Sequence, residues 1–209
     1  MRIAVCDVGL GNLRSVRRAL EVAASRAGAS VDVAVTADAD ALARADKVVF
    51  PGQGAFRDCA RALDRGMGDA LRAAIARGAP YLSICLGLQV LFGTSDEAEG
   101  CAGLGVYAGH VRRLAPGAGA DGVAHKVPHT GWNTVARASG ATLPEAGWFY
   151  FVHSFVAEPD DPSLVAGRTR HGADEFVSAI ERDNVFACQF HPEKSQEEGL
   201  ALLERFVRR

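Results

Sequence analysis

Residues 81–91 have the sequence YLSICLGLQVL, an apolar run with Cys85 at its centre. The pattern predicts a buried strand that ends at Cys85 and passes at once into a short apolar helix. A tight turn of this kind holds the side chain at the sheet edge, above the first amides of the helix. Those amides favour the thiolate, which is the nucleophilic form of cysteine. The stretch alone fits a buried core cysteine equally well, because free cysteine is among the most buried residue types.

The composition is typical of an ordinary soluble globular protein. The chain has 209 residues, of which 48% are apolar and 23% are charged, and we expect one domain over residues 1–209. Its net charge of -2 gives no indication of a nucleic-acid or anionic-membrane partner. No apolar run approaches the roughly 20 residues that span a bilayer. The first residues already have a strand pattern, which does not fit a signal peptide.

The cysteines are odd in number, five in all, and show no CxxC spacing. This usage favours reduced thiols in a cytoplasmic protein over a disulfide framework or a zinc site. The chain also lacks a GxxxxGK phosphate loop and a GxGxxG turn after a strand. We therefore predict no metal and no cofactor. Apart from Cys85, the thiols are expected to be structural or incidental: Cys6, Cys59, Cys101 and Cys188.

Strands and helices alternate through the first half of the chain. Alternation of this kind is typical of a parallel sheet covered by helices on both faces. In such sheets the ligand crevice lies beyond the carboxyl ends of the strands, where Cys85 and a glycine turn at 52–54 fall. The predicted strands cover 2–7, 31–35, 47–50 and 80–84. The predicted helices run from Asn12 as N-cap to Gly28, over 38–44, and up to Gly78 with a break at Gly66.

The second half is richer in strand patterns. Two polar stretches, 93–103 and 115–122, are expected to be loops, and 183–184 a hairpin turn. The final helix begins with a capping-box pattern from Ser195 to Glu198. We predict an α/β fold with an open, mixed, mostly parallel sheet, helices on both faces and a nucleophile elbow at Cys85. The strands expected in this half cover 106–114, 133–137, 148–152, 163–169, 175–181 and 185–190.

The run CQFHPE at 188–193 predicts a partner for the cysteine. It is a strand that ends in a His-x-Glu pair, and alternation places His191 and Glu193 on the same side. Pro192 fixes the backbone between them. A histidine beside a thiol takes its proton, and a carboxylate on the other ring nitrogen orients the ring. A solvated turn is the alternative for this run taken alone.

The turn PGQGAF at 51–56 follows a buried strand. Its two glycines let the backbone approach a ligand closely and turn amides inward. Together with the amide of Leu86, these groups are candidates for an oxyanion hole. A plain turn is the alternative, because a PGxG run alone is a weak signal.

Three of these runs, SICLGLQ at 83–89, QFHPEKS at 189–195 and PGQGAF at 51–56, resemble the class I (triad) glutamine amidotransferases. Three more resemble, within that family, the glutaminase subunits of imidazole glycerol phosphate synthase: DVGLGNLRSV at 7–16, PHTGWN at 128–133 and FVHSF at 151–155. The match covers nearly the whole chain in the same order. The resemblance implies a flavodoxin-like amidotransferase fold and hydrolysis of L-glutamine to glutamate and ammonia through a cysteine thioester.

The resemblance also implies roles for individual positions. The implied catalytic triad is Cys85, His191 and Glu193. Family members form heterodimers with a (β/α)8-barrel cyclase and pass ammonia to it internally, and the cyclase makes imidazole glycerol phosphate and an aminoimidazole carboxamide ribotide in histidine biosynthesis. The implied oxyanion and glutamine-binding positions are Gly52, Gln53, Gly54, Leu86, Gln89, Glu97, His153, Ser154 and Phe155. The positions implied near the partner and the ammonia path are Asn12, Trp132, Tyr150 and Lys194.

Two positions depart from the family pattern. Ser83 stands where glycine is usual, with little expected effect, and Gln53 stands where an aliphatic residue is more common, which bears on a backbone flip at the oxyanion hole. Two other functions stay open: a glutaminase subunit for pyridoxal phosphate, anthranilate or aminodeoxychorismate synthesis, and a non-catalytic binding subunit of the same fold. His110, His125 and His171 show no partner spacing and are expected to be surface or strand-end residues.

Overall fold

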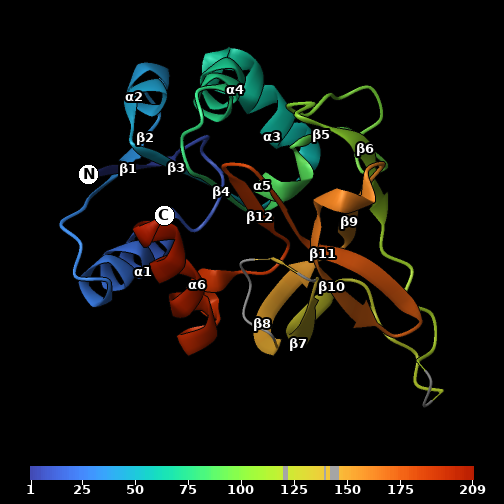
Figure 1. The fold of residues 1–209 in the computed structure, drawn as a ribbon. Coiled ribbons are helices and arrows are strands. Elements are labelled where there is room, and N and C mark those ends of the chain that lie inside the picture. The colour runs from blue at the N-terminus through green and yellow to red at the C-terminus, as the bar shows by residue number, and fades with distance from the viewer. Residues whose placement is uncertain (120–121, 139, 142–145) are drawn as a thin grey trace.

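The computed structural model (Figure 1) describes residues 1–119, 122–138, 140–141 and 146–209. Its centre is an open nine-stranded sheet in which five neighbouring strands, β2, β1, β3, β4 and β12, run parallel and the remaining four are antiparallel. This confirms the predicted α/β class with a mixed, largely parallel sheet. In spatial order the strands are β2 (Asp32–Thr36), β1 (Arg2–Cys6), β3 (Lys47–Gly52), β4 (Tyr81–Cys85), β12 (Val185–Cys188), β11 (Asp174–Arg182), β10 (Val165–His171), β7 (His129–Arg137) and β8 (Ala146–His153).

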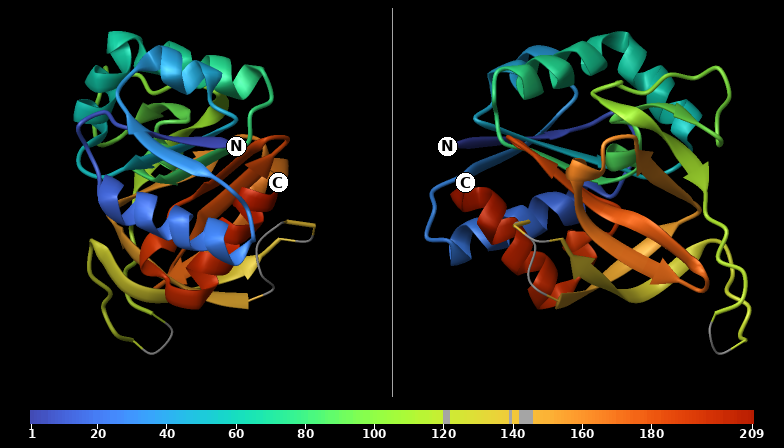
Figure 2. Two further views of the ribbon diagram at one scale, coloured as in Figure 1. Left: turned by 90° about the vertical axis from the view of Figure 1, so that its left-hand side faces the viewer. Right: turned by 45° about the vertical axis from the view of Figure 1, so that its right-hand side comes forward.

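Helices cover both faces of the parallel half, as predicted (Figure 2). One face carries α2 (Ala39–Arg44), α3 (Phe56–Ala62) and α4 (Gly68–Ala76), and the other carries α1 (Leu13–Arg26) and α6 (Gln196–Arg208). The core therefore divides into two layers. Alternate residues of β1 enter opposite layers, since Cys6 packs with the α2–α4 side and Val5 with the α1–α6 side.

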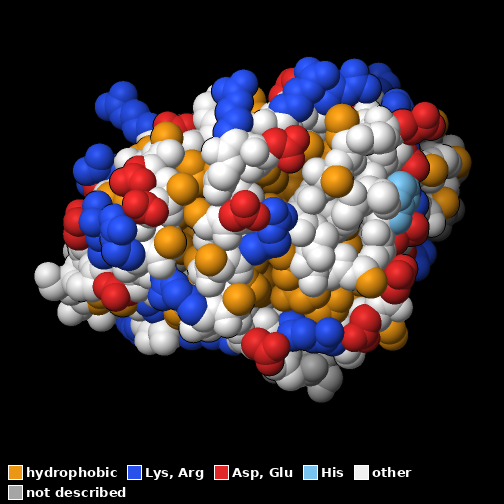
Figure 3. All heavy atoms as spheres, turned by 90° about the horizontal axis from the view of Figure 1, so that it is seen from above, with side chains coloured by type: hydrophobic (Ala, Val, Ile, Leu, Met, Phe, Trp, Pro, Cys, Tyr) orange, Lys and Arg blue, Asp and Glu red, His pale blue; other side chains and the backbone are white. Residues whose placement is uncertain are grey.

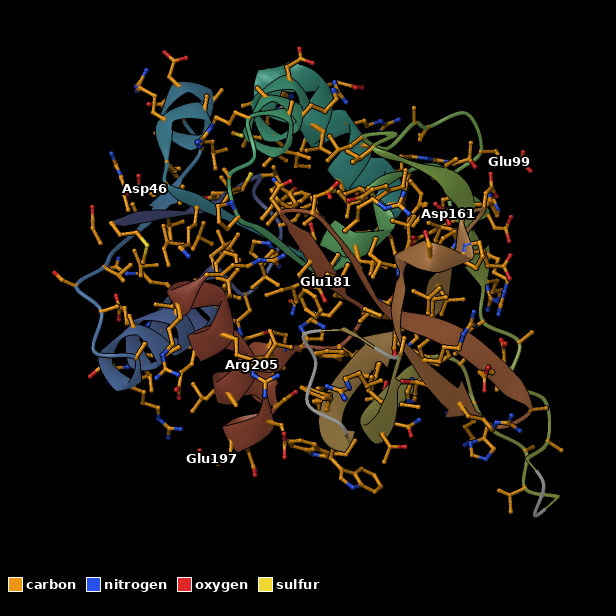
Figure 4. The ribbon with its side chains drawn as sticks, in the orientation of Figure 1. Asp46, Glu99, Asp161, Glu181, Glu197 and Arg205 are labelled. Atoms are coloured by element: carbon orange, nitrogen blue, oxygen red, sulfur yellow. The ribbon has the colours of Figure 1, made fainter. Side chains whose placement is uncertain are left out.

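The two helices of the second layer are joined at their ends. Arg26 of α1 makes two hydrogen bonds, of 2.6 and 2.9 Å, to the carboxylate of Glu197. Glu197 lies on α6 (Figure 4). On the opposite side, over α2 and α4, basic and acidic side chains are interspersed (Figure 3). No helix in the described part of the chain is long and apolar enough to cross a membrane.

Several predicted local signals are confirmed. Asn12 caps α1, because its side chain accepts a hydrogen bond from the amide of Ser15. The helical region after β3 breaks at Gly66, whose φ of 93° is non-helical, within a π-helical turn over Leu63–Met67. Asp183 adopts a φ of 52° in the turn that joins β11 to β12.

Other local predictions are wrong. Ser195 does not cap α6 through its side chain; its hydroxyl donates to the carbonyl of His191 (2.6 Å) and accepts from the amide of Tyr150 (3.0 Å). The predicted strand at 163–169 begins with a 3-10 turn at Pro162–Leu164. The predicted loop at 115–122 is not contradicted: its described residues belong to no helix or strand, although Ala118 forms an isolated bridge with Ala124, and residues 120–121 lie outside the described part of the chain.

The predicted loop at 93–103 begins inside a strand. A second sheet of three strands contains β5 (Phe92–Ser95), β6 (Tyr107–Arg113) and β9 (Phe155–Pro159). The polar residues of β5 find partners in β6, where Thr94 pairs with His110 and Ser95 with Val111. β9 has no counterpart among the predicted strands and follows β8 directly, which brings residues 153–155 next to the end of β4.

Candidate active site

Cys85 lies at a strained strand-to-helix turn. It ends β4 with φ 56° and ψ -110°, and α5 (Leu86–Gln89) starts at the next residue. Neighbouring glycines make the turn possible. A Cβ atom at Gly52 would lie 2.8 Å from Cβ of Leu86 and 2.9 Å from the amide nitrogen of Gly87. The predicted elbow is therefore present, and the Cys85 side chain reaches a cavity although the residue is only 6% exposed.

His191 and Glu193 form a buried pair where the chain leaves β12. The Glu193 carboxylate accepts a hydrogen bond of 2.8 Å from Nδ1 of His191, so the ring carries its proton on that nitrogen. The amide of His191 is anchored by the carbonyl of Tyr150 at 2.9 Å. Nε2 of His191 has no hydrogen-bond partner among the described residues, which leaves it available for proton transfer.

The charge state of His191 is set by opposing effects. Burial disfavours the charged ring, but the neighbouring Cys85 and Glu193 outweigh burial and raise the pKa of His191 to about 9. The ring is thus an imidazolium near neutral pH. An imidazolium beside a thiol favours the thiolate, as nucleophilic catalysis by cysteine requires.

A cavity of about 350 Å³ collects most of the predicted site residues. Its size is that of a small-molecule pocket. Polar groups and short backbone segments from distant parts of the chain meet here, at the carboxyl ends of β3, β4 and β8. The lining residues are Gln53, Gly54, Cys85, Leu86, Gln89, Glu97, Val152, His153, Ser154, Phe155, His191 and Lys194.

Some predicted residues do not line this cavity. Gly52 packs beneath Leu86, and Glu193 lies behind His191. Of the residues assigned to the partner, Lys194 does line it and also lies over the ring of Tyr150, 5.7 Å from its centroid. Tyr150 in turn contacts Trp132 edge to face, with ring centroids 6.1 Å apart. Asn12 caps the start of α1 and is not among the residues that line the cavity.

The sequence did not predict a row of hydrogen-bonded histidines beside the cavity. Nδ1 of His153 donates to the carbonyl of Phe155 (3.0 Å), so its Nε2 accepts from Nδ1 of His129, also at 3.0 Å. Asn133 completes the row by donating to Nε2 of His129 at 3.2 Å. Both rings are neutral, because burial lowers the pKa of His129 to about 4 and that of His153 to about 3.

The three histidines expected to be surface or strand-end residues, His110, His125 and His171, are partly exposed, and His171 ends β10, but each of them has a partner. His171 stacks on His129 with ring centroids 4.1 Å apart, and its Nε2 lies 3.0 Å from the carbonyl of Lys126. His125 meets the edge of His171 at 4.8 Å. His110 of β6 lies 2.6 Å from Asp96, which directly follows β5. No signal in the sequence marks these pairs, because each histidine meets its partner only when segments distant in the chain fold together.

The structure also gives the positions of Glu97 and of the cysteines. Glu97 accepts a hydrogen bond from the amide of Phe56 at 3.1 Å, which ties it to the start of α3. All five cysteines are free, and Cys101 is the only one of them that is not buried. Among the described residues, no group of three or more His, Cys, Asp or Glu side chains is arranged to hold a metal ion.

Comparisons with known proteins agree with this geometry. The model of the family "Glutamine amidotransferase class-I" matches residues 5–209. The "Imidazole glycerol phosphate synthase subunit HisH" of Dechloromonas aromatica is 49% identical, over 98% of this chain and 95% of its own. The protein of the same name from Thiobacillus denitrificans is 47% identical, over 98% and 90%.

Solved structures support the same fold at low sequence identity. A structure described as "Crystal structure of glutamine amidotransferase" superposes with a TM-score of 0.73 at 19% identity, covering 99% of this chain and 97% of that chain. PurLQS from Thermotoga maritima gives a TM-score of 0.71 at 18% identity, covering 100% and 99%.

Proposed function

Because the chain belongs to the class-I glutamine amidotransferases, and within them to the HisH subunits of imidazole glycerol phosphate synthase, we propose that Cys85, His191 and Glu193 are its glutaminase triad. One observation carries this proposal. The strained Cys85 elbow and the His191–Glu193 pair, which are distant in sequence, meet at one cavity of about 350 Å³. The substrate is L-glutamine, and the ammonia serves histidine biosynthesis.

The reaction begins with acyl transfer to sulfur. The Cys85 thiolate attacks the side-chain amide carbon of glutamine, and the carbonyl electrons move onto oxygen. The amide of Leu86 and those of the 52–54 turn hold this oxyanion. Nε2 of His191 then gives its proton to the leaving nitrogen, the carbon–nitrogen bond breaks, and ammonia departs from a glutamyl thioester.

The second half-reaction restores the enzyme. His191, now neutral, takes a proton from water, which attacks the thioester carbon. The carbon–sulfur bond breaks, glutamate leaves and the thiolate returns beside an imidazolium. Glu193 keeps the ring in the same orientation through both steps, because it holds Nδ1.

The cavity fits the polar ends of glutamine. Glu97 is the one carboxylate among the described residues that line it, and it suits the α-ammonium group of the substrate. Gln89 and the backbone of residues 153–155 add uncharged polar groups. These features support glutamine as the ligand.

Removal of the sulfur tests the triad. We expect Cys85→Ala to stay folded and to have no measurable glutaminase activity, assayed as glutamate release in the presence of the cyclase and its nucleotide ligand. Cys101→Ala is the matched control: it removes a half-exposed thiol from a loop and should keep full activity. Ordinary turnover by Cys85→Ala would contradict the assignment of Cys85 as the nucleophile.

The partner in this proposal is a (β/α)8-barrel cyclase. An aromatic surface supports it: Trp132 is 43% exposed and packs on Tyr150, which contacts Lys194 at the cavity. Half-buried aromatic anchors of this kind are enriched in binding interfaces. The names of the relatives favour this partner over a chorismate-using enzyme or a pyridoxal phosphate synthase.

Co-purification and titration with the cyclase test this partner. We expect Trp132→Ala to raise the dissociation constant for the cyclase by about tenfold or more, because truncation of an aromatic anchor typically lowers the binding free energy by over 1 kcal/mol. Arg44→Ala, on the exposed side of α2, should leave it unchanged. Glutaminase rates should rise stepwise from the chain alone, to the complex, to the complex with ligand; equal rates in all three would contradict a partner-dependent site.

A further inference from the structure

A buried glutamine lies against the sulfur of Cys85 and has no part in the mechanism above. Gln189 follows β12, is 0% exposed and is not among the residues that line the cavity. Its Nε2 lies 3.6 Å from Sγ of Cys85, within the distance of a nitrogen–sulfur hydrogen bond. Its Oε1 accepts a hydrogen bond of 3.1 Å from Nε2 of Gln89. The side chain therefore bridges α5 and the nucleophile.

The orientation of both amides is fixed by the carbonyl of Phe155. A backbone carbonyl only accepts, so Gln89 must turn its Nε2 toward it, at 2.9 Å. The same Nε2 uses its second hydrogen to donate to Gln189, so the acceptor on Gln189 must be its Oε1. Gln189 is then left with Nε2 facing the sulfur. The carbonyl itself is held from β8, where Nδ1 of His153 also donates to it at 3.0 Å.

We propose that Gln189 donates a hydrogen bond that stabilises the thiolate of Cys85, with Gln89 and the Phe155 carbonyl as the positioning groups that keep the donor end of the amide toward the sulfur. The proposal rests on the assignment of Cys85 as nucleophile. An amide donor discriminates between the two forms of the sulfur, because a thiol is a weak acceptor and a thiolate a much stronger one.

The charges of the other groups around the sulfur are compatible with stabilisation of the thiolate by Gln189. From the turn after β12, His191 supplies a positive charge, with Glu193 behind it. Cys188 of β12 is neutral, since burial raises its pKa well above the ordinary value, and it donates to the carbonyl of Phe190. His153 of β8 is neutral as well. The remaining charged groups that line the cavity are Glu97 and Lys194.

The low dielectric of the buried site strengthens the hydrogen bond from the Gln189 amide to the Cys85 thiolate. Gln189 is fully enclosed, so water cannot replace its hydrogen bond when the amide is removed. Hydrogen bonds to charged groups stabilise by more than those between neutral groups. Loss of this donor should therefore shift the ionisation of the sulfur to higher pH by about one unit.

The test measures the rate of Cys85 alkylation by iodoacetamide against pH in the full chain. Gln189→Met and Gln189→Leu both remove the donor and keep much of the side-chain volume, and two replacements guard against one that fails to fold. Peptide-resolved mass spectrometry separates Cys85 from the half-exposed Cys101, which serves as the internal reference thiol. The plateau rate at high pH reports access to the sulfur.

We expect the midpoint for Cys85 to move up by about one pH unit in both variants, with an unchanged plateau and an unchanged Cys101 profile. Midpoints that coincide with that of the parent protein, or a change confined to the plateau, would overturn the proposal in favour of a packing role. Alkylation needs no glutamine turnover. Failure of this hydrogen bond is thus distinguished from failure of the triad, which the Cys85→Ala assay tests.

Discussion

Oε1 of Glu193 lies 2.8 Å from Nδ1 of His191, and the two side chains are 2% and 1% exposed. A carboxylate buried to this degree has few compensating partners besides the ring; its other oxygen, Oε2, has none among the described residues. The pair therefore couples strongly, and Glu193 is one of the groups that raise the pKa of His191 to about 9.

Neutralising this carboxylate should destabilise the protonated ring of His191. In Glu193→Gln the amide oxygen can still accept from Nδ1, so the ring keeps its orientation, but the negative charge is gone. We expect the pKa of His191 to fall from about 9, measured by NMR titration, and glutaminase activity with the cyclase to fall by about 10² or more. Glu99→Gln makes the same change on an exposed loop (Figure 4) and should alter neither. An unchanged His191 titration in Glu193→Gln would refute the coupling.

The buried histidines give the stability of the fold a dependence on pH with two limbs. The pKa of His191 is raised above its ordinary 6.5 to about 9, so its stabilising contribution is full below pH 6.5 and is lost as pH rises through 9. His129 and His153 act in the opposite direction. Their pKa values are lowered to about 4 and about 3, so the unfolded chain takes up more protons below pH 6.5 and stability falls on acidification.

For these groups we expect the free energy of unfolding to be greatest near pH 6.5, measured by urea denaturation between pH 4 and 9. His191→Gln should flatten the alkaline limb. His129→Phe, which keeps a ring against Phe151, should make the acid limb shallower. Parallel profiles for parent and variants would contradict this origin of the two limbs.

The sequence predicts the parallel half of the fold well, and the reasons are local. Buried strands with glycine turns after them were recognisable from short windows, and so was the elbow at Cys85. The family predicted from the runs around Cys85 and His191 is confirmed by the comparisons. β5 was missed because Thr94 and Ser95 are polar and gain their strand pairing only from β6.

What the sequence could not predict depends on contacts between distant segments. The His129–His153 hydrogen bond joins two strands that pair only in the folded sheet. Ser195 fits the capping pattern, but its hydroxyl instead links β8 to the turn that carries His191. One sequence feature could have indicated a role for Gln189: it is a polar residue within the apolar run predicted as a strand at 185–190, close to the candidate base.

Close packing behind the elbow gives a last prediction. Gly52 pairs with Cys85 across β3 and β4, and a methyl group there would meet Leu86 and Gly87 at 2.8 and 2.9 Å. Both contacts are shorter than real Cβ contacts, and one is with backbone, so α5 would have to move. We expect Gly52→Ala to lower the free energy of unfolding by about 1–3 kcal/mol, measured by urea denaturation.

The displaced helix should also affect catalysis, because the amide of Leu86 is a proposed oxyanion donor. We expect glutaminase activity in the Gly52→Ala complex to fall by about 10² or more. Gly93→Ala is the matched control, since a Cβ atom there meets nothing within 4 Å and the residue has no positive φ. It should keep parent stability and activity. If Gly52→Ala behaved like Gly93→Ala, the close approach of β3 to the elbow would not be what positions the first amides of α5.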